Sequence, residues 1–266
     1  MSAHHPIDTR LPEMLRSGRS LRGVFNSIPS AAVVEMCGYA GFDFVVIDNE
    51  HGSADLQTTE NMLRAARASG IAPIVRCFEA DMARVLDMGA SGVQVPMVET
   101  AEQAARIAAR MRYPLPLGAP GLSGRRGSAF SSRAAGYGAF GGPAHTQRSN
   151  EGLVLVLMVE SPTGVANADE IAAVPGVDAV FVGPNDLAHA MGHENRWTDS
   201  PVQHAMEQVV RATAAAGKCP GILALNPQEQ ERYAAWGARY FATVTTALFT
   251  RALRHAAQGV DPSLAY

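Results

Sequence analysis

The chain has one lysine among its 266 residues, and this scarcity excludes one kind of carbonyl chemistry. Enzymes that activate a ketone as a Schiff base need a lysine inside the active site. Lys218 follows Gly217 and directly precedes an apolar segment that we expect to be a strand. It would therefore lie at the amino-terminal face of a parallel barrel, away from the face that carries catalysis. The sequence argues against Schiff-base chemistry.

Paired cysteines, long apolar runs and an excess of basic charge are also missing. Cys37, Cys77 and Cys219 are isolated and show no metal-ligand spacing, which indicates free thiols in a reducing compartment. The longest apolar run, residues 153–159, is too short to span a bilayer, and the polar amino terminus has no secretory signal. A formal net charge of -3 gives no basic surface for nucleic acid or for an anionic membrane. We expect a cytoplasmic protein without nucleic-acid or membrane partners.

Short apolar segments alternate with segments of helical period along the whole chain. The strands are expected at residues 21–26, 42–48, 72–76, 92–97, 153–160, 178–182, 219–224 and 240–245. The helices are expected at residues 30–40, 57–69, 81–88, 101–112, 165–174, 202–216, 227–236 and 248–257. Such alternation predicts an α/β protein with a single (β/α)8 TIM barrel domain over residues 1–266, with an open doubly wound sheet as the alternative.

One connection interrupts this alternation, because residues 113–152 are rich in glycine, serine and proline. Long loops inside compact domains are usually functional or disordered. We expect the part near Arg125 and Arg126 either to cross the top of the barrel or to reach a neighbouring subunit. The alternative is a solvated insertion whose arginines face water.

Titratable side chains follow the apolar strands at their carboxyl ends. Residues 42–52, FDFVVIDNEHG, end in Asp48, Asn49, Glu50 and His51, where barrel enzymes carry their chemistry. Two further strands, which are neighbours in a barrel, deliver Glu160 and Asp186 to the same rim. A hard divalent cation commonly takes one or two carboxylates, with water and substrate oxygens completing its shell. The alternative roles are helix capping for Glu160 and a turn hydrogen bond for Asp186.

Several of these motifs together resemble the HpcH/HpaI family of class II pyruvate aldolases. They are DNEH at 48–51, Arg76, LDMG at 86–89, VPMVET at 95–100, VE at 159–160 and GPNDL at 183–187, in order across roughly residues 24–252. Family activities include 4-hydroxy-2-oxoheptanedioate aldolase and 2-dehydro-3-deoxyglucarate aldolase. The resemblance implies a TIM barrel of the phosphoenolpyruvate/pyruvate type that cleaves 4-hydroxy-2-oxo acids into pyruvate, or a related 2-oxo acid, and an aldehyde.

The resemblance also implies roles for individual residues. Glu160 and Asp186 would bind Mg²⁺, Mn²⁺ or Co²⁺, with no organic cofactor, and Arg76 would lie over the ketone and enolate oxygen. His51 would be the base, with Asp48 nearby to fix its tautomer. Further candidate substrate contacts are Gly183, Pro184, Asn185, Leu223 and Arg126. Members of this family are hexamers, and Asp87 matches an acid that is given to a neighbouring subunit's site.

Purely structural roles are the alternatives for three of these residues. Asp48 could accept backbone N–H bonds in a turn, His51 could be structural, and Arg76 could form a rim salt bridge with Glu50.

The sequence departs from the family pattern at two places. Met158 stands where several of these aldolases have glutamine, which removes a hydrogen-bond donor two residues before Glu160. The loop PLGAPGLSGRRGSAF also differs, and either Arg125 or Arg126 could match the family's arginine. A different carbon–carbon lyase or decarboxylase, similar to the citrate lyase beta subunit, is the alternative within the family. A noncatalytic barrel that binds oxo acids is the alternative outside enzymes.

Overall fold

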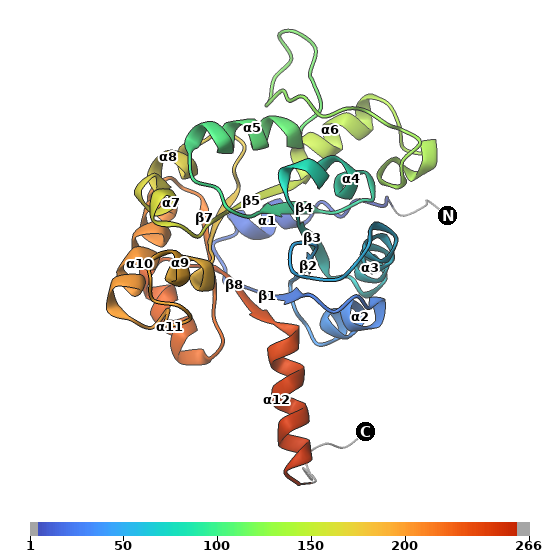
Figure 1. Cartoon of the computed structure of the whole chain (residues 1–266). Coiled ribbons are helices and arrows are strands. Elements are labelled where there is room, and N and C mark those ends of the chain that lie inside the picture. Colours follow the sequence, from blue (N-terminus) through green and yellow to red (C-terminus); the bar gives the residue numbers. More distant parts are fainter. Residues whose placement is uncertain (1–4, 260–266) are drawn as a thin grey trace.

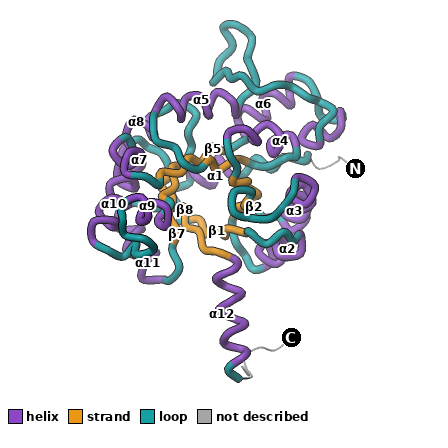
Figure 2. Tube along the Cα trace, in the orientation of Figure 1, coloured by secondary structure: helices purple, strands orange, loops and turns teal. Residues whose placement is uncertain are grey.

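Eight parallel strands close into a barrel in the computed structural model, which describes residues 5–259 (Figures 1 and 2). Each strand pairs with the next one in the chain, and β8 pairs with β1. The strands are β1 Leu21–Asn26, β2 Phe44–Asp48, β3 Ala72–Arg76, β4 Gly92–Val95, β5 Val154–Val159, β6 Ala179–Val182, β7 Cys219–Leu223 and β8 Tyr240–Val244. The barrel expectation is confirmed, and the open sheet is wrong. The expected domain limits at residues 1 and 266 lie outside the described residues.

Helices follow the strands around the outside of the barrel. They are α1 Leu11–Arg16, α2 Ala31–Tyr39, α3 Leu56–Ser69, α4 Met82–Asp87, α5 Ala101–Met111, α6 Pro143–Gly152, α7 Pro162–Ala166, α8 Ala168–Ala173, α9 Pro184–Ala190, α10 Ser200–Ala215, α11 Pro227–Trp236 and α12 Thr245–Ala257, with short 3-10 helices η1 Glu79–Asp81 and η2 Arg133–Gly138. Thr100 and Asn226 cap the helices α5 and α11, because their side chains accept the backbone N–H groups of Gln103 and Glu229. Within residues 5–259, no helix is both long and apolar enough to cross a membrane.

Large side chains fill the barrel interior and leave room only near the carboxyl ends of the strands. Phe44 and Tyr240 stack with their ring centroids 4.1 Å apart. Leu11 and Leu15 of α1 belong to the same buried cluster, so this short helix covers the amino-terminal end of the barrel. Solvent therefore reaches the interior from the carboxyl end, which is where the titratable residues lie.

Two parts of the expected helix pattern are wrong. The predicted loop at 113–152 contains η2 and α6, which apolar periodicity did not reveal because the α6 sequence is almost entirely polar. Tertiary contacts hold α6 in place instead. The Asn150 side-chain amide accepts the backbone N–H of Tyr113 and donates to the Tyr113 carbonyl. The predicted helix at 165–174 is split into α7 and α8 at Asn167, whose side chain donates to the Glu99 carbonyl.

The last helix does not pack along the barrel as the sequence suggested. In Figures 1 and 2, α12 projects away from the strands, and Thr245 is its single buried residue. Phe249 and Leu253, one turn apart, are 38% and 69% exposed. An amphipathic helix with its apolar side in water is unusual for a monomer.

Candidate active site

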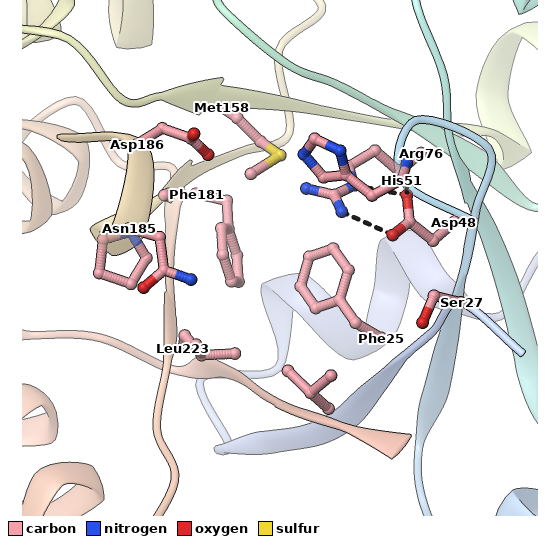
Figure 3. A pocket seen from close by; sticks show the side chains of 13 residues that line it. Phe25, Ser27, Asp48, His51, Arg76, Met158, Phe181, Asn185, Asp186 and Leu223 are labelled. Atoms are coloured by element: carbon pink, nitrogen blue, oxygen red, sulfur yellow. Dashed lines mark hydrogen bonds and ion pairs between the residues drawn. The ribbon is translucent and has the colours of Figure 1, made fainter. Parts of the chain in front are cut away.

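A cavity of about 320 Å³ opens at the carboxyl ends of the strands (Figure 3). Most of the residues predicted for the site line it: Asp48, His51, Arg76, Gly183, Pro184, Asn185, Asp186 and Leu223. Neighbouring strands deliver them, because the parallel register sets Asp48 beside Arg76 and Val159 beside Val182. The residues that follow Val159 and Val182, which are Glu160 and Gly183, therefore meet at one rim.

Arg76 is fixed by the two acids of β2 and the turn after it. Its Nε and Nη2 donate to the two carboxylate oxygens of Asp48 at 2.9 and 2.7 Å, and Nη1 lies 3.1 Å from Glu50. The guanidinium also lies 4.9 Å from the centre of the Phe25 ring. Burial opposes the charge on Asp48, but the Arg76 hydrogen bonds and charge hold the pKa of this carboxyl below its usual range. The guanidinium is thus held in one orientation, with donors left for a ligand oxygen.

The imidazole of His51 stands at the mouth of the cavity, with its side chain 61% exposed. Its Nε2 lies 3.9 Å from Glu50, whereas Asp48 contacts only the backbone N–H of His51. The expectation that Asp48 fixes the His51 tautomer is therefore wrong, because Arg76 occupies both Asp48 oxygens. The alternatives drawn from sequence, a turn role for Asp48 and a rim salt bridge between Arg76 and Glu50, are both observed.

Glu160 is buried, and one of its oxygens has no partner. Oε1 accepts the Met97 N–H at 2.7 Å, while Oε2 has no hydrogen-bond partner among residues 5–259. The pKa of Glu160 is raised to about 7, chiefly by burial and to a smaller extent by the charges of Asp186 and Glu50, while the Met97 N–H and Arg76 oppose the shift. The alternative capping role is wrong, because the Ser161 hydroxyl caps α7. A buried carboxylate oxygen without a partner is costly unless something absent from the protein binds it.

Gly183 leaves space directly in front of that oxygen. A Cβ at this position would overlap Oε2 of Glu160. Gly183 precedes α9, a helix that sequence reasoning read as a loop, and Asp186 lies in its first turn. The Asp186 side chain is exposed and points into the cavity beside Met158 (Figure 3). An acidic pair with an open space before it matches the needs of a hard divalent cation.

Glu160 and Asp186 are the two carboxylates here that do not pair directly with Arg76 among the described residues. No cluster of three or more His, Cys, Asp or Glu side chains suited to a metal occurs in the described part of the chain. A cation held by Glu160 and Asp186 would therefore draw its remaining ligands from water and substrate, as Mg²⁺ commonly does. The residues present fit such an ion through the buried, unpartnered Oε2 and the cradle at Gly183.

Arg126 and Asp87 lie away from the cavity of their own chain. Arg126 Nη2 donates to Asp87 at 2.6 Å, and its guanidinium stacks on Tyr113 at 4.5 Å. Arg112 follows the end of α5, where the chain has returned to the amino-terminal face of the barrel. The backbone N–H of Arg126 bonds the carbonyl of Arg112, so Arg126 lies toward that face. The expectation that this loop crosses the top of its own barrel is wrong, and so is substrate binding by Arg126 within one chain.

Some functional groups were not found from sequence. Met97, which donates to Glu160, has φ 58 without being glycine. Backbone strain of this kind concentrates at functional sites, but the sequence VPMVET carries no sign of it. Phe25, Ser27, Phe181 and Val244 also line the cavity. The alternation of inward-facing and outward-facing residues along each strand could have identified Phe25, Phe181 and Val244.

Comparisons with known proteins agree with this geometry. The family described as HpcH/HpaI aldolase/citrate lyase matches residues 21–251. The chain belongs to this family. A hydroxypyruvate/pyruvate aldolase of Delftia acidovorans is 39% identical over 231 residues, 86% of this chain and 83% of that protein. A 5-keto-4-deoxy-D-glucarate aldolase of Salmonella arizonae is 38% identical, with 83% and 84% covered. An HpcH/HpaI aldolase/citrate lyase family structure from Burkholderia cenocepacia J2315 superposes with a TM-score of 0.88 at 33% identity, covering 94% of this chain and 98% of that one.

Family membership and the similarity to aldolases make this protein a carbon–carbon lyase. Its cavity lies at the carboxyl ends of the strands, where TIM-barrel enzymes carry their active sites.

A methyl group at Gly183 should block the cation site of this lyase. Gly183→Ala places carbon against Glu160 Oε2, so we expect Mn²⁺ affinity to fall about tenfold or more in a calorimetric titration. Gly127→Ala is the matched control, because its added carbon meets nothing within 4 Å. Equal Mn²⁺ affinity in Gly183→Ala and the native protein would contradict a cation at Oε2.

Stability without metal should fall as the pH rises. Since the pKa of Glu160 is raised from 4.5 to about 7 on folding, its contribution is fully present below pH 4.5 and is lost through pH 7. Glu160→Gln should remove this component, up to about 3 kcal/mol of unfolding free energy between the two limits. Urea denaturation of both proteins in chelator at pH 5 and pH 8 measures it. Equal pH dependence in the two would show that Glu160 titrates normally.

Proposed function

We propose that this lyase is a class II aldolase that reversibly cleaves 4-hydroxy-2-oxo acids to pyruvate, or a related 2-oxo acid, and an aldehyde. The observation that carries the proposal is the buried, unpartnered Glu160 oxygen near Asp186, at the strand ends where Arg76 and Asp186 line the cavity. The Delftia acidovorans and Salmonella arizonae relatives, both named as aldolases, support this substrate class.

Glu160 and Asp186 would hold Mg²⁺, Mn²⁺ or Co²⁺, and no organic cofactor is needed. Such an ion supplies Lewis acidity that polarises a carbonyl oxygen. The absence of a lysine near the cavity leaves this as the available electrophile, because Lys218 lies before β7 at the other end of the barrel.

Different side chains would stabilise the developing negative charge and transfer the proton. Arg76 directs donors at the oxygen of C2, where negative charge develops as the bond between C3 and C4 breaks, and this favours the transition state. Asp48 acts as a positioning residue for that guanidinium. His51, at the cavity mouth where an aldehyde would leave, accepts the proton of the C4 hydroxyl and returns a proton to C3 once the C3–C4 bond has broken. Gly183, Pro184, Asn185 and Leu223 would border the oxo acid.

Exchange of the pyruvate methyl protons in D₂O tests these roles. We expect Mn²⁺-dependent exchange that falls about 10²- to 10⁴-fold in His51→Ala, since a general base contributes this much. We expect a similar loss in Arg76→Lys, which cannot form the paired bonds to Asp48. His204→Ala on α10 is the control, because that imidazole is exposed on another face. Exchange that persists in excess chelator would refute the metal role.

The assembly expected from sequence is a homo-hexamer, and we propose it for this chain. Exposed Phe249 and Leu253 on the projecting α12 support an interface through that helix. Asp87, whose side chain is partly exposed, would then be available to a neighbouring subunit's site, whereas the Arg126 side chain is buried in its own chain and would position Asp87. A cytoplasmic location accords with three free, buried cysteines.

Charge on the apolar side of α12 should break the assembly. Phe249→Glu with Leu253→Glu puts carboxylates into the proposed interface, so the mass from light scattering should drop below that of a hexamer. Arg251→Glu lies on another side of the same helix and should leave the mass unchanged. A hexamer that survives the double substitution would exclude α12 from the contact.

A further inference from the structure

Charged and apolar side chains both line the active-site cavity. Asp48, His51 and Arg76 lie together, and Asp186 lies across from them (Figure 3). The apolar part of the lining comes from five different strands, namely Phe25, Met158, Phe181, Leu223 and Val244. A ligand held by the polar groups must therefore turn its remaining surface toward carbon and sulfur.

Met158 lies near charged groups of the cavity. It belongs to β5 and precedes Glu160 by two residues. In Figure 3 its sulfur lies between the Asp186 carboxylate and the Arg76 guanidinium. Its partner in the strand register is Phe181, another residue of the cavity wall. A small molecule that bridges Arg76 and the acidic pair must contact Met158.

The chemistry of a 2-oxo acid decides which of its atoms meets that side chain. Its oxygens lie on C1 and C2, and these match the guanidinium and a cation that the acidic pair would hold. Its C3 substituent is the part left for the apolar wall. A hydroxyl there would lose its bonds to water against a thioether and an aromatic ring, since sulfur is a weak acceptor and donates nothing.

We propose that Met158, with Phe181, forms the C3 pocket and makes this enzyme select 2-oxo acids with hydrogen or alkyl at C3 over those with a C3 hydroxyl. The preferred class is pyruvate and 2-oxobutanoate, and the disfavoured one is hydroxypyruvate. This inference rests on the proposed function. It separates this chain from relatives whose printed name includes hydroxypyruvate.

The test measures exchange at C3 in D₂O with Mn²⁺ for pyruvate, 2-oxobutanoate and hydroxypyruvate, with the rate without enzyme subtracted. In each turnover a C3–H bond breaks and a C3–D bond forms, with no change of oxidation state. For the native enzyme we expect kcat/KM at least about tenfold higher for 2-oxobutanoate than for hydroxypyruvate. Met158→Gln, which supplies a donor and an acceptor, should move this ratio about tenfold toward hydroxypyruvate.

Met158→Leu is the matched control, because it keeps a similar volume without polar atoms and should preserve the native ratio. Pyruvate exchange with an unchanged ratio in Met158→Gln would overturn the C3 pocket and leave the aldolase proposal standing. A kcat/KM ratio near one between 2-oxobutanoate and hydroxypyruvate in the native enzyme would also overturn the C3 pocket and leave the aldolase proposal standing. Lack of metal-dependent exchange with all three oxo acids would refute the proposed function and this inference with it.

Discussion

Four carboxylates share one arginine at the carboxyl end of this barrel. Asp48 and Glu50 pair with Arg76 directly, and the charges of Glu160 and Asp186 act on the same group of residues. Repulsion among buried acids is strong because the protein interior screens charge poorly. Burial is the main cause of the raised pKa of Glu160, and the charges of Asp186 and Glu50 add to it. A divalent cation at the Glu160 and Asp186 pair would neutralise most of this excess.

Barrel topology is what concentrates that charge. Each of these acids follows or ends a strand whose register with its neighbour is parallel, so residues distant in sequence arrive at one rim. The same closure buries Glu160 and sets Gly183 against its free oxygen, where a Cβ would overlap it. Strand alternation also brings apolar residues into the cavity lining. Charge stabilisation and selection of the C3 substituent thus come from different side chains of one pocket.

The fold and most of the proposed site could be predicted because both depend on short-range patterns. Strands with apolar residues on both faces, such as β2, are recognisable from composition, and the acids at their ends are visible in the sequence. Long-range packing accounts for what was missed. The polar helix α6 forms through contacts such as that of Asn150 with Tyr113. The direction of α12 and the partner of Asp48 likewise depend on neighbours that no local pattern reveals.

Diffraction from crystals grown with Mn²⁺ and pyruvate tests the central claim most directly, because manganese scatters anomalously. The account predicts one anomalous peak about 2 Å from Oε2 of Glu160 and from a carboxylate oxygen of Asp186, with pyruvate density reaching toward Arg76. A peak that contacts neither acid, or pyruvate bound without a metal between these residues, would contradict it.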